Sequence, residues 1–303
     1  MLNLNRFAPV LATTLMLFSV SQPAEADSTF EVLRSYYELD ANLPLALEKQ
    51  SDVLSDGKRV VDLTFKGFDN EMISGRMEYL TVEGGGGKRP VVILLHGITQ
   101  SLDQWWRTDD GPYSFPAAHR EALVKNGFAV LAIDLRNHGA RLQSHDFANP
   151  YAYLEQSYFE AARKMISQSV LDVRRTIDVA QTFEEIDAER IAIAGFSLGA
   201  WTGFLAASVD ERVDASVIIG MPFLLPAKGQ STHFISQFEY VVGLQGKPML
   251  LIAGSKDHFY TKDVVDMLEQ KLSPSGAVKW LESGHDFPRS TAALTLEFLN
   301  GAY

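Results

Sequence analysis

The feature that most constrains the fold is a serine between two glycines, in the segment 195–199, which has the sequence Gly-Phe-Ser-Leu-Gly. It follows a compact apolar run, 191–194, and precedes a stretch, 200–207, that is typical of a helix. A serine at such a junction predicts a sharp strand-to-helix turn. Larger side chains two positions before or after Ser197 would collide with neighbouring elements, which explains the glycines. Ser197 is therefore a candidate nucleophile on a strained turn.

Short apolar runs recur beyond Pro90, at 91–95, 128–133, 191–194, 215–219 and 249–253. They lack polar alternation, which is typical of strands buried on both faces of a parallel sheet. A helical pattern separates two of them, with apolar residues at spacings of three and four: Val170, Val173, Ile177 and Ala180. Strands that alternate with helices predict an α/β fold with a mostly parallel, doubly wound sheet.

The sequence before Pro90 has a different pattern. Apolar and polar side chains alternate over 61–66 and again over 76–79, which predicts two half-buried strands. Asp69 and Asn70 between them favour a turn. We expect an N-terminal antiparallel hairpin at the start of the sheet. The stretch 29–50 is expected to be partly helical and amphipathic.

The N-terminus has the pattern of a signal peptide. Arg6 is the only charged side chain in the first 24 residues, an apolar stretch covers 7–20, and small residues stand at Ala24 and Ala26. The apolar stretch is short for a membrane span, so we expect cleavage after Ala26. The sequence thus predicts a signal peptide, 1–26, a single domain, 27–303, and a secreted or periplasmic protein.

The cysteine content and the net charge limit the kinds of partner that the protein is expected to bind. The chain has no cysteine, so neither a lipid-modified cysteine nor a disulfide is expected. The formal net charge is −11, which argues against nucleic acid and anionic membranes as partners. The expected partner is a small molecule, with no membrane contact after signal cleavage.

A serine nucleophile needs a base within hydrogen-bond reach, and the base needs an acid that orients it. In open parallel sheets such groups lie beyond the carboxyl ends of the strands. Asp257 follows the apolar run 249–253, and His285 follows another short apolar pair at 280–281. The chain order is then Ser197, Asp257, His285.

Other residues compete for two of these roles: His258 and His96 for the base, and Asp263 and Asp286 for the acid. His258 adjoins Asp257, and adjacent side chains on a turn rarely face one another. His96 is better placed to support the loop that follows residue 95. Asp286 adjoins the candidate base, and Asp263 is expected in the next helix.

Two backbone amides are expected to bind the oxyanion that forms when serine attacks a carbonyl, those of Leu198 and Ile98. Trp105 and Trp106 follow the Ile98 loop and are candidate walls of a substrate pocket, as is Phe287. Aromatic residues at such positions pack equally often in a core or at a rim.

The segment 134–139 carries Asp134, Arg136 and His138, which invite a metal-site interpretation. A zinc site would need three ligands with a recognisable spacing, which the segment lacks. Hydrogen bonding that orders the loop is the favoured interpretation, and we expect no metal and no cofactor. Residues 139–168 exceed a simple crossover and could form a small flap beside the site.

Five segments together resemble the α/β-hydrolase superfamily: the His96-Gly97 loop, 134–139, the 195–199 turn, the Asp257 turn and the His285 loop. The resemblance covers roughly 59–298. It implies a serine hydrolase in which Ser197 is the nucleophile, His285 the base and Asp257 the orienting acid. The segment 36–45 is also similar to the branch that holds acetyl-xylan esterases, dienelactone hydrolases and prolyl-oligopeptidase-like catalytic domains.

The resemblance implies an esterase that acts through an acyl-enzyme. Only 27 residues, 221–247, are available for a lid, so no large lid is expected and small or medium ester substrates are favoured. A prolyl-oligopeptidase-like peptidase or amidase is an alternative, which the lack of a preceding size-selecting domain disfavours. A non-catalytic binding protein with the same fold is a second alternative. It is disfavoured because all three triad positions are filled.

Overall fold

A computed structural model describes residues 24–81, 87–142, 150–155, 158–225 and 231–303. The predicted signal peptide lies outside these residues except for its last three, which begin helix α1. Within the described residues, no helix is long and apolar enough to cross a membrane.

In the described part of the chain, nine strands form one sheet in the order β1-β2-β3-β5-β4-β6-β7-β8-β9. The strands are β1 (Glu48–Ser55), β2 (Lys58–Lys66), β3 (Met72–Leu80), β4 (Arg89–Leu95), β5 (Ala129–Ile133), β6 (Ile186–Phe196), β7 (Ala215–Ile219), β8 (Met249–Gly254) and β9 (Gly276–Leu281). Strands β4 to β9 pair in parallel, whereas β1, β2 and β3 pair antiparallel, and β3 joins the rest by antiparallel pairing with β5.

Five of the parallel strands match the predicted apolar runs, whereas β9, which is only partly buried, was not predicted as such a run. Strands β2 and β3 form the predicted hairpin. The antiparallel part has one more strand than predicted, β1. Nearly all side chains of β1 are exposed, so its sequence lacks the alternation that marks a half-buried strand.

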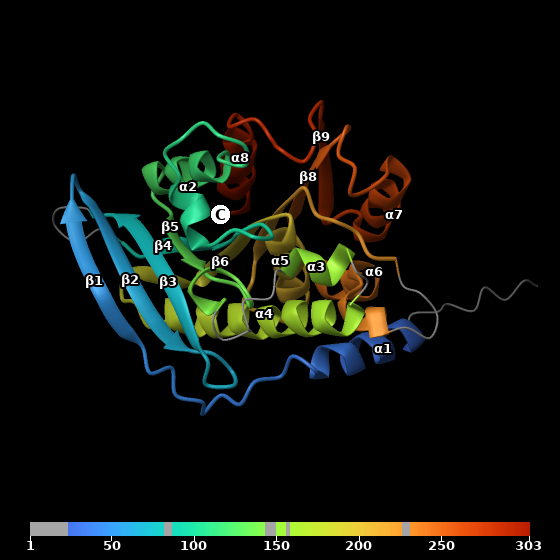
Figure 1. Ribbon diagram of the computed structural model, residues 1–303, viewed down its shortest axis with the longest axis horizontal. Coiled ribbons are helices and arrows are strands. Elements are labelled where there is room, and N and C mark those ends of the chain that lie inside the picture. Colours follow the sequence, from blue (N-terminus) through green and yellow to red (C-terminus); the bar gives the residue numbers. More distant parts are fainter. Residues whose placement is uncertain (1–23, 82–86, 143–149, 156–157, 226–230) are drawn as a thin grey trace, which may run out of the picture.

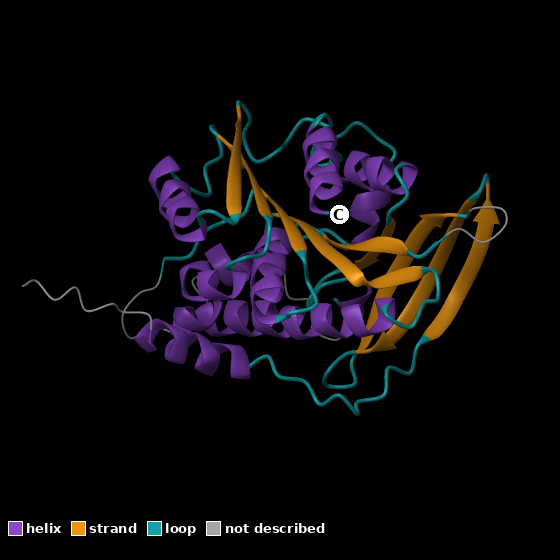
Figure 2. Ribbon diagram, turned by 180° about the vertical axis from the view of Figure 1, so that it is seen from behind, coloured by secondary structure: helices purple, strands orange, loops and turns teal. Residues whose placement is uncertain are grey.

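Helices cover both faces of the sheet (Figures 1 and 2). The longer ones are α1 (Ala24–Ser35), α2 (Pro116–Lys125), α4 (Phe159–Ala180), α5 (Leu198–Val209), α7 (Lys262–Leu272) and α8 (Thr291–Ala302). The side chains of β4 explain why two layers are needed. Val91, Ile93 and Leu95 lie in the core under α4 and α5, whereas Val92 and Leu94 lie in the core under α2 and α8.

Short helices complete the connections between these elements. They are η1 (Leu102–Trp106), η2 (Gly139–Arg141), α3 (Pro150–Glu155), η4 (Ser231–Ile235), α6 (Gln237–Tyr240) and η5 (Val241–Leu244). The predicted flap at 139–168 corresponds to η2, α3 and the start of α4, apart from 143–149 and 156–157, which lie outside the described residues. One described flap residue, Tyr151, reaches the candidate site.

Candidate active site

Ser197 lies at the sharp turn between β6 and α5, as the glycine pattern predicts. Its backbone φ is 54° and its ψ is −113°, an unfavourable conformation for a residue with a side chain. A Cβ atom on Gly195 would lie 2.2 Å from the Gly199 carbonyl oxygen, and one on Gly199 would lie 2.2 Å from the Leu95 carbonyl oxygen. The turn therefore excludes side chains at both glycines and presents the serine at the end of β6.

The structure brings together the three residues that the chain order predicts. The Ser197 Oγ lies 2.9 Å from the His285 Nε2, and the His285 Nδ1 lies 2.7 Å from the Asp257 Oδ2. Because an ionised carboxylate only accepts hydrogen bonds, Nδ1 carries the proton and Nε2 accepts from the serine hydroxyl. All three side chains are less than a tenth exposed. This is the arrangement that attack of a serine on a carbonyl requires.

Asp257 is held as a charged acceptor. Burial alone would raise its pKa, but hydrogen bonds from His285 and from the Phe259 backbone N–H hold the pKa below its usual range. The hydroxyl of Tyr260 also lowers the pKa of Asp257, and it accepts a 2.8 Å hydrogen bond from the Gly254 N–H. Asp257 thus stays ionised beside the imidazole.

The other candidate acids and bases do not take part in this hydrogen-bond chain. Asp286 accepts a 3.0 Å hydrogen bond from the Tyr113 N–H, and Asp263 lies exposed in the first turn of α7. His258 lies at the rim of the site. His96 is fully buried beneath the loop that follows β4.

His96 and Gln104 fix this loop. The His96 Nδ1–H donates to the Gly97 carbonyl oxygen at 2.8 Å, and its Nε2 accepts from the Leu135 N–H at 3.0 Å. Burial lowers the pKa of His96 to about 4, so the ring is neutral, as this pair of bonds requires. The Gln104 Oε1 accepts from the Gly97 N–H at 2.9 Å.

The two amides predicted to bind an oxyanion flank Ser197. Ile98 lines the cavity at the serine, and Leu198 begins α5 directly after it. In the described parts of the chain, neither N–H donates a hydrogen bond to another protein group. Both donors are therefore available to a substrate oxygen, and the start of a helix adds a favourable dipole at Leu198.

A cavity of about 370 Å³ opens at the serine, and we call it the nucleophile cavity. Its lining comprises Ile98, Thr99, Gln100, Gln104, Tyr113, Tyr151, Phe196, Ser197, His258, Phe259 and His285. Several of these are aromatic. Phe259 packs edge-on against the base, with its ring centroid 4.4 Å from that of His285.

The three predicted pocket walls do not line this cavity. Trp105 is fully buried in the core. Trp106 faces away from the cavity, and its Nε1–H donates to the Glu78 carboxylate at 2.7 Å. The guanidinium groups of Arg76 and Arg120 lie over its ring. Phe287 packs in the core against Phe115 and Phe196. An aromatic residue after a strand carries no sequence signal for the side it faces, so these three assignments were wrong.

Tyr113 is a wall residue that the sequence did not indicate. Its backbone has a φ of 60°, its N–H donates to Asp286, and its carbonyl oxygen accepts from the Gln104 Nε2 at 3.2 Å. Its ring stacks on Phe196 at 6.0 Å. Such a position depends on tertiary contacts with 104 and 286, which no local pattern reveals.

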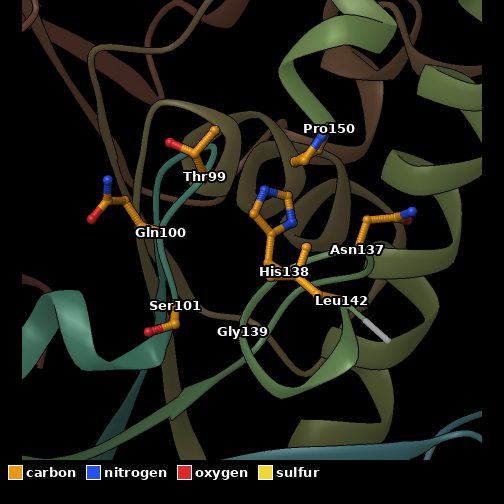
Figure 3. A pocket seen from close by; sticks show the side chains of 8 residues that line it. All are labelled: Thr99, Gln100, Ser101, Asn137, His138, Gly139, Leu142 and Pro150. Carbon is orange, nitrogen blue, oxygen red and sulfur yellow. The ribbon is translucent and has the colours of Figure 1, made fainter. Parts of the chain in front are cut away.

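A second cavity, of about 510 Å³, adjoins the first, and we call it the adjoining cavity (Figure 3). Thr99 and Gln100 line both cavities. The remaining lining residues are Ser101, Asn137, His138, Gly139, Leu142 and Pro150.

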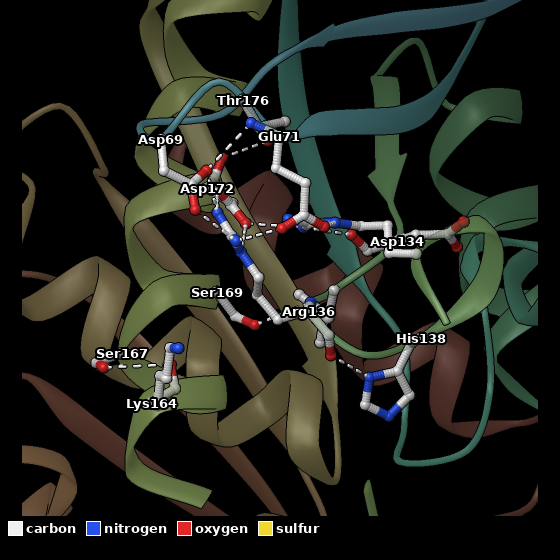
Figure 4. Close-up of polar contacts among 12 residues, drawn as sticks. Asp69, Glu71, Asp134, Arg136, His138, Lys164, Ser167, Ser169, Asp172 and Thr176 are labelled. Carbon is white, nitrogen blue, oxygen red and sulfur yellow. Dashed lines mark hydrogen bonds and ion pairs between the residues drawn. The ribbon is translucent and has the colours of Figure 1, made fainter. Parts of the chain in front are cut away.

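Beneath the adjoining cavity, the segment 134–141 is ordered by hydrogen bonds, as predicted. Asp134 accepts from the Leu102 and Ala140 N–H groups at 2.8 and 2.9 Å. Arg136, 1% exposed, pairs with Asp69, Glu71 and Asp172 (Figure 4). This buried cluster ties the β2–β3 turn and α4 to the loop. Among the described residues, no three His, Asp or Glu side chains are arranged so that they could hold a metal ion.

A dienelactone hydrolase family model matches residues 113–293, more than half of the chain. The chain belongs to the dienelactone hydrolase family. This membership agrees with the resemblance that the sequence motifs indicate, and it makes the protein a hydrolase. The matched region contains Ser197, Asp257 and His285.

Solved structures with the same fold include three esterases. An acetyl xylan esterase from Paenibacillus sp. R4 has a TM-score of 0.65 at 17% identity, covering 92% of this chain and 94% of its own. An acetyl xylan esterase from Thermoanaerobacterium sp. has a TM-score of 0.65 at 15% identity, with coverages of 93% and 94%. An esterase from Pyrococcus furiosus has a TM-score of 0.58 at 21% identity, with coverages of 80% and 92%. At these identities the likeness establishes the α/β-hydrolase fold.

Proposed function

We propose that this hydrolase is a serine carboxylesterase that acts through an acyl-enzyme. The observation that carries the proposal is the continuous hydrogen-bond chain from Ser197 through His285 to Asp257, buried beside a cavity. The fold shared with proteins named esterases supports it.

In the first half-reaction, Ser197 Oγ attacks the ester carbonyl carbon while His285 Nε2 takes the hydroxyl proton. The Ile98 and Leu198 N–H groups hold the oxyanion. His285 then protonates the leaving alcohol, and the acyl group remains on the serine. In the second half-reaction, His285 takes a proton from water as the water oxygen attacks the acyl carbon. His285 then returns this proton to Ser197 Oγ as the bond between the acyl carbon and Oγ breaks, which releases the acid and restores the serine.

The size of the nucleophile cavity supports the proposal that the acyl group of the substrate is small or medium. Its volume is about 370 Å³, and part of its wall is aromatic. A series of 4-nitrophenyl esters from acetate upward tests the proposal, with wild type and Ser197→Ala side by side. We expect turnover only in wild type and the highest kcat/KM at a short acyl chain. Equal turnover by Ser197→Ala would overturn the assignment of the nucleophile.

We also propose that the protein is exported. The support is the sequence of residues 1–26, with its single positive charge, apolar stretch and small residues before the cleavage point. Expression of the full chain in a bacterial host, followed by N-terminal sequencing of the exported product, should give a mature protein that starts at Asp27. An intact Met1 on cytoplasmic protein alone would contradict this.

A further inference from the structure

The adjoining cavity lies next to the nucleophile cavity, and one loop contributes to the walls of both. Thr99 and Gln100 belong to both linings, so a ligand bound at Ser197 that passes this loop enters the adjoining cavity. At about 510 Å³, it is also the larger of the two. An ester has an acyl side and an alcohol side, and two neighbouring cavities that share a loop offer a separate place for each.

The two cavities differ in chemistry. Phe196, Phe259 and Tyr113 give the nucleophile cavity aromatic walls that suit a short acyl chain. In the adjoining cavity, Thr99, Gln100, Ser101 and Asn137 supply hydroxyl and amide groups. A hydrocarbon there would leave polar groups without partners, which costs free energy. The polar cavity therefore suits the alcohol side, provided that it carries hydroxyl groups.

His138 supplies a specific acceptor in this cavity. Its Nδ1–H donates to the Arg136 carbonyl oxygen at 2.6 Å, so Nε2 carries a lone pair. The side chain is 1% exposed, and within the described residues Nε2 has no hydrogen-bond partner. Figure 3 shows the ring rising between Thr99 and Pro150. Buried polar atoms almost always have partners, so this lone pair is suited to a ligand donor.

The surroundings keep His138 neutral and fixed. Burial, together with the nearby His96, lowers its pKa to about 3. The residue that accepts its Nδ1–H, Arg136, is itself anchored by Asp69, Glu71 and Asp172. The ring therefore presents an acceptor, and not a donor, at neutral pH.

We propose that the adjoining cavity binds the alcohol portion of a polyol ester, and that His138 Nε2 accepts a hydrogen bond from one of its hydroxyls. This rests on the proposed function, because Ser197 must position the ester bond. His138 is then a specificity-determining residue, and the substrate class is a short-chain acyl ester of a polyhydroxylated alcohol.

Two acetates test the proposal: methyl 6-O-acetyl-glucoside and cyclohexylmethyl acetate, which share a primary ester on a six-membered ring and differ in hydroxyls. Two variants separate the ring nitrogens. In His138→Asn, the side-chain amide takes the place of Nδ1 and can still donate to the Arg136 oxygen, but the Nε2 acceptor is lost. In His138→Gln, an amide oxygen takes the place of Nε2, and the bond to Arg136 is lost.

We expect wild type to prefer the glucoside ester in kcat/KM. This preference should fall about threefold to tenfold in His138→Asn, as expected for one hydrogen bond, and stay within about twofold of wild type in His138→Gln. An unchanged preference in His138→Asn, or an equal loss in both variants, would overturn the proposal. Turnover of 4-nitrophenyl acetate by wild type and Ser197→Ala, measured in parallel, separates failure of this inference from failure of the proposed esterase function.

Discussion

At the scale of single residues, the site is built from groups whose protonation is set by their neighbours. Asp257 is kept ionised by two hydrogen bonds, from His285 and from the Phe259 N–H. That charge fixes the tautomer of His285, so that Nε2 faces the serine hydroxyl. The acid therefore acts through the orientation of the base.

Asp257→Asn tests this role of the acid. An asparagine can donate to His285 Nδ1, which would place the ring proton on Nε2 and block acceptance from Ser197. We expect kcat to fall by about 10⁴ with the fold retained. Asp263→Asn, on the exposed side of α7, is the matched control and should retain wild-type kcat. A value for Asp257→Asn within tenfold of wild type would contradict the assignment.

At the scale of elements, two connections determine the site: the β6–α5 turn that carries Ser197 and the loop from β4 to η1 that carries Ile98. Their sequences differ in how much they reveal. The turn can be predicted from the sequence because its steric demand falls on Gly195 and Gly199, which lie only two residues from Ser197. The loop is held by Gln104, whose partners include the carbonyl oxygen of Tyr113, and no spacing rule predicts such a bond.

Gly199→Ala tests the steric demand of the turn. The new Cβ would lie 2.2 Å from the Leu95 carbonyl oxygen, so β4 and α5 would have to separate. We expect a loss of about 2 kcal/mol or more in the free energy of unfolding, measured with urea. Gly301→Ala in α8, where a Cβ meets nothing within 4 Å, should be neutral or slightly stabilising. Equal stability of the two variants would refute the steric account.

Gln104→Met tests whether Gln104 supports the loop from β4 to η1, which carries Ile98. The substitution keeps the size of the side chain but leaves the Gly97 N–H unpaired. We expect kcat to drop about tenfold, because Ile98 would no longer be held in place, while KM changes less. Gln245→Met, at an exposed position, is the control. If KM rises and kcat stays at the wild-type value, the loop acts in binding and not in catalysis.

At the scale of the whole molecule, the sequence predicted the parallel half of the sheet well, because strands buried on both faces have continuous apolar runs. It missed β1, whose side chains are exposed, and it misplaced Trp105, Trp106 and Phe287, since apolar character does not distinguish a core from a pocket. Of the buried histidines, His96 and His138 could be recognised as loop supports because they lie in motifs, whereas His119 could not.

Three fully buried histidines should make the fold sensitive to acid. Burial lowers the pKa of His96 to about 4 and of His119 and His138 to about 3, whereas in the unfolded chain each titrates near 6.5. Between these values the unfolded state binds more protons, so stability falls as the pH drops below about 6.5. The expected slope approaches about 4 kcal/mol per pH unit near pH 5, from three protons.

Urea unfolding from pH 7 to pH 5 measures this slope. His119→Gln removes one titrating group that hydrogen-bonds to Thr291 and Thr295 and lines neither cavity, and it should reduce the slope by about a third. Asp134 and Asp214, whose pKa values burial raises, oppose the trend at the acid end of this range. A flat profile from pH 7 to pH 5 would contradict neutral burial of the three rings.

The most direct test of the central claim is labelling of the mature protein with a fluorophosphonate probe, followed by peptide mapping. If the hydrogen-bond chain from Asp257 through His285 activates Ser197, wild type should take up one probe per chain on the peptide that contains Ser197, and Ser197→Ala should take up none. Labelling at another residue, or a wild type that remains unlabelled while folded, would contradict the account.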